Sequence, residues 1–153
     1  MQKTNMALFI VAILFLTGMS TTATSKTEIQ EYETLFRDGN FEIRYYPSAV
    51  MASVEMEGSY DQMKNKGFRT LAGYIFGNNQ QNMKISMTSP VRFSENRDEV
   101  RMSFVMPSEM DIENLPEPGD ERIHLHRTDP VYVASLKFGG YSSDAKIEAR
   151  KKV

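Results

Sequence analysis

Apolar and polar residues alternate along two stretches of the chain, and the second stretch repeats the first 82 residues later. Residues 52–58 (ASVEMEG) align with residues 134–140 (ASLKFGG) without a gap, and the apolar alternation at 41–43 recurs at 123–125. Period-two spacing is typical of a β-strand with one buried face. A glycine and then a helical segment follow each copy. The pattern therefore predicts one strand-and-helix unit that is used twice, within an α+β fold.

The first copy predicts a long strand over residues 41–57, with a bend at Pro47, which has no amide proton to donate to a neighbouring strand. Because side chains alternate between the two faces of a strand, six apolar residues fall on the inner side. They are Phe41, Ile43, Val50, Ala52, Val54 and Met56. A shorter strand is expected to precede the turn at residues 37–40.

Apolar residues at helical spacing follow the first copy. Residues 60–77 are expected to form a helix that Ser59 caps, because Gln62 lies three residues further on, as a capping box requires. The residues expected to seat this helix on the sheet are Met63, Gly67, Leu71, Tyr74 and Ile75. Phe68, Ala72 and Phe76 widen this stripe. They either broaden the core face or line part of a ligand site.

Two further alternating runs, at residues 83–87 and 100–106, predict a hairpin with one apolar face. Pro90 is expected to mark an edge or a bulge in the first arm. Residues 107–122 contain three prolines, a glycine and several acids, which favours a surface connection between the two copies.

The second copy predicts a strand over residues 123–138 and a helix that starts at Ala145, and the sequence ends at Val153 inside that helix. The first copy consists of strand, helix, strand and strand, whereas the second has no hairpin. We therefore expect a second unit that is truncated at the C-terminus, shorter than the first by roughly 30 to 40 residues. Completion of the fold from elsewhere is the less favoured alternative.

The first 25 residues have the composition of a secretory signal. Lys3 supplies the positive charge, residues 6–19 are almost all apolar, and residues 20–25 are small and polar, which predicts cleavage near Ala23. The apolar run is shorter than the roughly 20 residues that cross a bilayer, so an uncleaved membrane anchor is the less favoured alternative. We expect an exported protein, periplasmic or secreted, with a signal peptide at 1–23 and one domain at 28–153.

Composition narrows the classes of function. The net charge is −2 and the basic residues form no run before the C-terminal tail, which argues against nucleic acid as a partner. The chain has no cysteine, which excludes disulfides, thiolate metal sites and covalent haem attachment through Cys-x-x-Cys-His. It also lacks Gly-x-Ser-x-Gly, a phosphate-binding loop and His-Glu-x-x-His, so no enzyme class is predicted.

Several stretches between residues 32 and 141 resemble the SOUL haem-binding proteins, in the order in which that family has them. The most specific are residues 67–79 (GFRTLAGYIFGNN) and 83–91 (MKISMTSPV), which occur together at the right separation. The others are residues 32–35 (YETL), 41–47 (FEIRYYP), 102–109 (MSFVMPSE), 115–118 (LPEP) and 138–141 (FGGY).

The resemblance implies a distorted eight-stranded β-barrel, or twin four-stranded sheets, built from two strand-helix-strand-strand units with a helix on each. It also implies reversible, non-covalent binding of haem or a related tetrapyrrole in a shallow apolar site beside the first helix, and hence a carrier or buffer of haem. Other proteins with this doubled fold bind other small molecules. An enzyme or sensor that acts on another flat apolar ligand is therefore the alternative.

The candidate haem-binding residues are Tyr45, Lys64, Asn65, Phe68, Arg69, Ala72 and Phe76. In some family members a His of the first strand has been proposed as an axial iron ligand, and this sequence has Tyr45 there. Tyr45 can ligate ferric iron or be a packed strand aromatic. The apolar face of the helix could contact the plane of a porphyrin. The cations at its rim either bind the propionates or are solvated surface residues. The missing hairpin would form one side of the family's ligand area.

Histidine and methionine offer alternative iron or metal ligands. His124 and His126 lie on one side of the predicted strand, but they align with the polar Glu42 and Arg44 of the first copy and have no third ligand nearby. A solvated polar face is therefore favoured over a metal site. The hairpin's inner face would carry Met83, Met87, Met102 and Met106, for which adaptable core packing is favoured over haem ligation.

Overall fold

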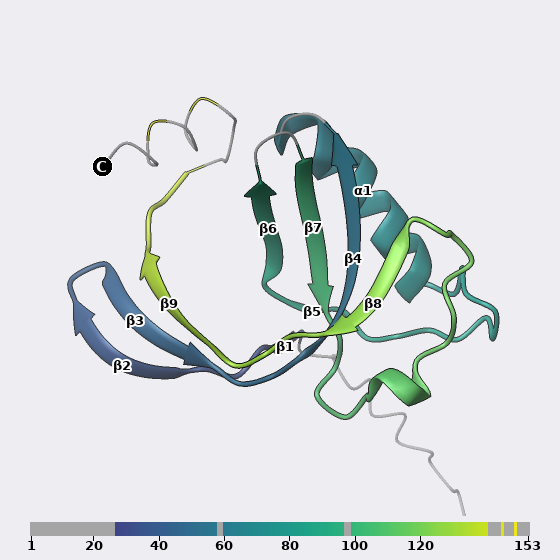
Figure 1. Ribbon diagram of the computed structural model, residues 1–153, viewed down its shortest axis with the longest axis horizontal. Helices are drawn as coiled ribbons and strands as arrows, with labels where there is room; N and C mark the ends of the chain where they lie inside the picture. Colours follow the sequence, from purple (N-terminus) through teal and green to yellow (C-terminus); the bar gives the residue numbers. More distant parts are fainter. Residues whose placement is uncertain (1–26, 58–59, 97–98, 141–144, 146–148, 150–153) are drawn as a thin grey trace, which may run out of the picture.

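A computed structural model describes residues 27–57, 60–96, 99–140, 145 and 149 of the protein (Figure 1). These residues form one α-helix, one short 3-10 helix and nine β-strands, so the predicted α+β class is confirmed. No helix within them is long and apolar enough to cross a bilayer. The predicted signal peptide at 1–23, the Ser59 cap and most of the predicted C-terminal helix lie outside the described residues.

A four-stranded antiparallel sheet in the order β6-β7-β4-β8 forms the centre of the molecule. Its strands are β4 (Val50–Glu57), β6 (Val91–Asn96), β7 (Glu99–Val105) and β8 (Ile123–Arg127). The helix α1 (Tyr60–Ile75) packs against β4 and β7 and covers one face of this sheet (Figure 1). The sheet and the helix together hold the apolar core.

The core confirms the helical periodicity of α1, whereas β4 is buried on both faces from Val50 to Val54 and not on one face as its alternation predicts. Every residue expected to seat α1 on the sheet is buried. A Cβ at Gly67 would meet the side chains of Met63 and Val54, so a glycine allows the helix to approach β4 closely. The sheet side of this core is formed by Ala52, Val54, Val100, Met102, Phe104 and Met106.

The prediction that residues 83–87 form the first arm of the hairpin is wrong. This segment is a loop, and the arm that pairs with β7 is β6. The loop runs back along α1 because the amide of Ile85 donates to the carbonyl of Ile75 (2.8 Å) and the side chain of Asn79 bonds Met83 in both directions. Its apolar alternation therefore reflects packing against the helix rather than against a sheet. Pro90, expected at an edge or bulge, has a cis peptide bond and separates β5 (Thr88–Ser89) from β6.

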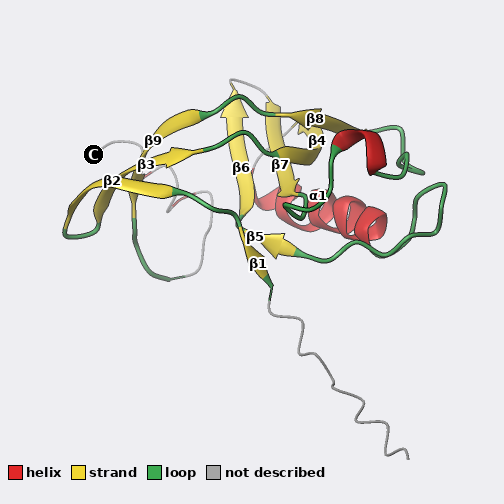
Figure 2. Cartoon of the chain, turned by 90° about the horizontal axis from the view of Figure 1, so that it is seen from below, coloured by secondary structure: helices red, strands yellow, loops and turns green. Residues whose placement is uncertain are grey.

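A second, three-stranded sheet has the order β2-β3-β9 and lies at the opposite end of the molecule from α1 (Figure 2). Its strands are β2 (Glu33–Asp38), β3 (Phe41–Tyr46) and β9 (Val131–Leu136), and a short β1 (Glu28–Ile29) pairs in parallel with β5. The 3-10 helix η1 (Ile112–Asn114) lies in the long connection before β8.

Two bent strands join the sheets. β3 continues into β4 and β8 continues into β9, and both bend at the same level. The register does not slip across the bends, because Tyr46 pairs with Val131 and Val50 pairs with Arg127. The predicted bend at Pro47 is therefore confirmed.

The described residues do not form the expected closed barrel. Among them β9 pairs only with β3, and β6 pairs only with β7, so nothing joins these two edges (Figure 1). The expectation that Phe41 and Ile43 point into the core is also wrong. Phe41 is 37% exposed and Ile43 is partly exposed, because α1 covers β4 and β7 and does not extend over β3.

Candidate functional site

Three of the predicted site residues form an apolar flank on α1. Phe68, Ala72 and Phe76 recur every fourth residue, so their side chains lie on the same side of the helix. The amide of Phe76 donates to the carbonyl of Ala72 (2.9 Å), which continues the helical backbone to Phe76. Phe68 is 38% exposed, Phe76 is 65% exposed and Ala72 is partly exposed. This α1 flank (Phe68, Ala72 and Phe76) therefore leaves the core and opens to solvent.

Aromatic side chains of the sheet extend the α1 flank toward β6 and β7. The ring of Phe68 packs edge-on against Phe104 with the centroids 5.4 Å apart, and Tyr60 packs against Phe93 at 4.6 Å. Phe93 is 36% exposed. Tyr60 and Phe93 are 33 positions apart in the sequence, so no local pattern predicts their contact.

Polar and basic residues border the α1 flank. Asn65 and Arg69 are exposed on the turns that adjoin Phe68. The ammonium of Lys64 contacts the carboxylate of Asp61 at 2.6 Å, and both side chains are 40% exposed. Such an exposed ion pair contributes at most about 1 kcal/mol, so it holds Lys64 only weakly. Lys64 and Arg69 place two cations at this border.

Tyr45, the predicted iron ligand, lies away from α1. It belongs to β3, and its ring packs against that of Tyr132 on β9 with the centroids 5.2 Å apart. It lines an open hollow with residues 29–33 and Pro47. Since β3 and α1 lie at opposite ends of the molecule, the structure does not bring Tyr45 together with the α1 flank (Figure 1).

A cluster of arginines and tyrosines that sequence analysis did not single out lies between the two sheets. The Arg44 guanidinium lies 4.2 Å from the ring centre of Tyr32, and its Nη1 donates to the hydroxyl of Tyr46 (3.2 Å). The Arg92 guanidinium lies 4.8 Å from the ring centre of Tyr46. Burial lowers the pKa of Arg92, whereas the hydrogen bonds with Tyr46 and Glu42 raise the pKa of Arg44. The cluster places two cations beside aromatic faces.

The other candidate ligands are the two histidines of β8 and four methionines. His124 and His126 lie on β8 opposite Ser53 and Met51 of β4, and no group of three His, Cys, Asp or Glu in the described residues is placed to hold a metal. Met102 is fully buried in the core. Met106 is 3% exposed, Met83 is partly exposed and Met87 is 36% exposed.

Comparison with known proteins identifies the family of the chain. The family model described as SOUL heme-binding protein matches residues 27–153. The chain is 32% identical over 118 residues to Heme-binding protein 2 of Homo sapiens, across 71% of this chain and 56% of that protein. It is 27% identical over 122 residues to Heme-binding protein 1 of Sus scrofa, across 74% of this chain and 64% of that protein.

The chain therefore spans less than two thirds of the length of these curated relatives. The matched residues include α1, both bent strands and the loop from α1 to β5. A match over this much of the chain shows that it belongs to the SOUL heme-binding protein family.

Proposed function

We propose that the protein binds haem non-covalently on the α1 flank and acts as a carrier or buffer of haem. The observation that carries the proposal is the exposed aromatic flank of Phe68, Ala72 and Phe76 beside the cations Lys64 and Arg69. A porphyrin is a flat apolar plate with two carboxylates at one edge. Phe68 and Phe76 lie eight residues apart, roughly 12 Å along a helix, and can contact such a plate over that length.

The residues present fit this ligand. Burying the exposed rings of Phe68 and Phe76 against the macrocycle removes apolar surface from water, which is favourable. Arg69 and Lys64 can donate charge-assisted hydrogen bonds to the propionates. The chain has no cysteine, so attachment would be reversible. The names of its relatives describe binding rather than catalysis, which supports a binding protein over an enzyme or sensor of the same fold.

Titration with hemin tests the proposal. We expect a saturable Soret shift at micromolar hemin, and only non-specific broadening would contradict it. Phe76→Ala should weaken binding about tenfold or more, because burying a Phe ring contributes roughly 1.5–3 kcal/mol. The matched control is Phe36→Ala on β2, a ring that is 54% exposed on the other sheet. If both variants bind hemin equally well, the α1 flank is not the site.

Ligation of iron by Tyr45 is a separate hypothesis, since Tyr45 and the α1 flank lie apart. In the same titration, Tyr45→Phe should remove any phenolate signature from the ferric spectrum. The control is Tyr132→Phe, which alters the neighbouring ring and is 70% exposed. An unchanged ferric spectrum in Tyr45→Phe would dismiss Tyr45 as the ligand and leave the α1 flank in place.

We further infer that the chain is exported, to a periplasm or outside the cell. The basic, apolar and small-residue regions of residues 1–25 support this inference. Mass spectrometry of the exported chain should find an N-terminus near Ala23. An exported chain that retains Met1 would contradict cleavage.

We also infer that the two bent strands are copies of one unit, as the sequence repeat predicts. The repeat offset of 82 maps β3 onto β8 and β4 onto the region of β9. The pairing supports this inference, because β3 pairs with β9 while β4 pairs with β8, in one continuous register. That exchange of partners is what a two-fold axis through the two bends would produce. A barrel would then require a partner strand on the second edge of β9.

A further inference from the structure

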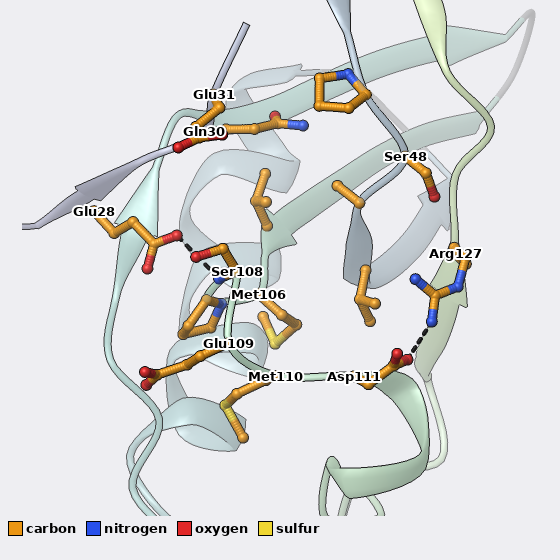
Figure 3. Close-up of a pocket in the computed structure, with 15 residues that line it drawn as sticks. Glu28, Gln30, Glu31, Ser48, Met106, Ser108, Glu109, Met110, Asp111 and Arg127 are labelled. Carbon is orange, nitrogen blue, oxygen red and sulfur yellow. Dashed lines mark hydrogen bonds and ion pairs between the residues drawn. The ribbon is translucent and has the colours of Figure 1, made fainter.

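A hollow of about 290 Å³ lies beside the bend between β3 and β4 (Figure 3). It is lined by β1 and the residues just after it, by the bend at 47–49, by the segment 105–111 and by Arg127 at the end of β8. None of its lining residues belongs to α1. Its volume is at the lower end of the roughly 300–1,000 Å³ that is typical of ligand pockets, so it suits a ligand much smaller than a tetrapyrrole.

The floor of the hollow is apolar. Val50, Val105 and Met106 line it and are 6%, 5% and 3% exposed. Met110, which is partly buried, lies beside them. A ligand with an apolar part can therefore contact this floor.

A buried amide donor faces the hollow. Gln30 is only 7% exposed, and its Oε1 accepts a hydrogen bond from Nη2 of Arg92 (2.5 Å). An arginine can only donate, so this bond fixes which end of the amide is oxygen and turns Nε2 away from Arg92. Nε2 is buried and has no partner among the described residues. Figure 3 shows it pointing over the hollow. Because an unpaired buried donor is unfavourable, an acceptor at this point would stabilise the protein.

The rim of the hollow is acidic. Four carboxylates line it (Glu28, Glu31, Glu109 and Asp111) against a single guanidinium, that of Arg127. Arg127 already pairs with Asp111, and Glu28 accepts from the amide of Ser108 at 2.9 Å. Glu31 and Glu109 are exposed and form no ion pair with any described residue. The carboxylates do not converge on a metal site, because the described residues contain no such group of three.

We propose that this hollow binds a small organic cation, an amine or a guanidinium compound, that also carries a hydrogen-bond acceptor. The cation lies at the acidic rim, the acceptor bonds Nε2 of Gln30, and the apolar part lies on the floor. The acidic rim disfavours the propionates of haem, so this site is distinct from the α1 flank and its ligand is independent of the proposed haem function.

The test uses L-argininamide as the probe, because it combines a guanidinium, a carbonyl acceptor and a short apolar chain. L-citrullinamide has nearly the same shape without the guanidinium charge. In two-dimensional NMR spectra, argininamide should shift the side-chain amide resonances of Gln30 saturably and bind at least tenfold more tightly than citrullinamide. No saturable shift of these resonances, or equal affinity for the two probes, would overturn the proposal.

Variants that remove negative charge from the rim test the proposed site. The double variant Glu31→Gln with Glu109→Gln keeps the shape of two exposed side chains, and it should weaken argininamide binding at least tenfold. Glu121→Gln, an exposed carboxylate outside the hollow, should leave binding unchanged. Hemin affinity should be the same in all these variants. Unweakened argininamide binding in the double variant would contradict the proposed site, whereas failure of hemin binding alone would leave it intact.

Discussion

Tyr74 has the largest side chain that is fully buried in the described part of the chain, and its hydroxyl is the polar end of the core. The hydroxyl donates to the carbonyl of Pro116 (2.9 Å), which ties α1 to the connection before β8. Burial raises the pKa of Tyr74 to about 12. A single side chain thus links helix packing to the position of a distant loop.

We expect Tyr74→Phe to lower the free energy of unfolding by about 1–3 kcal/mol at neutral pH, because the carbonyl of Pro116 stays buried without its donor. The difference should depend on pH. The phenol ionises near pH 10 in the unfolded chain but near 12 in the folded protein. The folded state therefore holds the proton longer, and the contribution of Tyr74 to stability falls as the pH rises from 10 toward 12.

Urea denaturation of both proteins at about pH 7, 10 and 11.5 measures this effect. The stability gap between wild type and Tyr74→Phe should narrow at the highest pH. A gap that stays constant over that range would mean that the phenol is not shielded from solvent in the folded protein.

At the scale of elements, the buried side chain of Asn79 bonds the end of α1 to the loop that leads to β5. Asn79 is 6% exposed, and its Nδ2 donates to the carbonyls of Tyr74 (3.0 Å) and Met83 (2.7 Å). Its Oδ1 accepts from the amide of Met83 (3.0 Å). The carbonyl of Tyr74, at the end of α1, also accepts from the amide of Gly77 (3.3 Å), and the two bonds with Met83 fix the loop beside the helix.

We expect Asn79→Ala to lower the free energy of unfolding by roughly 3 kcal/mol, since three hydrogen bonds of about 1 kcal/mol each are lost. Gln81→Ala, an exposed change in the same loop, should cost less than about 0.5 kcal/mol. Urea denaturation of the two variants measures the difference. Equal stability of the two would show that the loop keeps its conformation without Asn79.

This loop also shows where sequence patterns succeed and where they do not. Alternation identified β7 correctly because Met102 and Phe104 pack on the helix from within a sheet. The same alternation at residues 83–87 predicted a strand wrongly. Ile85 is buried, but it belongs to a loop and not to a strand. The bonds of the Asn79 side chain fix that loop, and a periodic pattern does not reveal them.

The candidate site could likewise be predicted only in part. The α1 flank was predictable because Phe68, Ala72 and Phe76 lie within one helix. The bond from Arg92 to Gln30 spans 62 residues, and no local pattern indicates it. The separation of Tyr45 from α1 depends on how the two sheets are arranged, which the repeat alone does not specify.

At the scale of the whole molecule, the two bent strands form the frame on which both sheets are built. If they are copies of one unit, β4 and β9 are equivalent strands in different surroundings. β4 has partners on both edges, β7 and β8, whereas β9 pairs only with β3 among the described strands. The burial differs accordingly, because Val50 to Val54 are all buried and β9 has no buried residue.

Hydrogen exchange followed by NMR should therefore separate these equivalent strands. Amides of Met51 to Val54 in β4 should exchange with the slowest rates in the protein, because β7 and β8 pair with both edges there and these residues are buried. Alternate amides of β9, those that point away from β3, should exchange about 100-fold faster or more, because an edge strand leaves them open to water. Equal protection of the two strands would mean that β9 has a second strand partner in solution. If that partner is another copy of the chain, the protection of the β9 amides should fall on dilution. A partner within the same chain would give protection that does not depend on concentration.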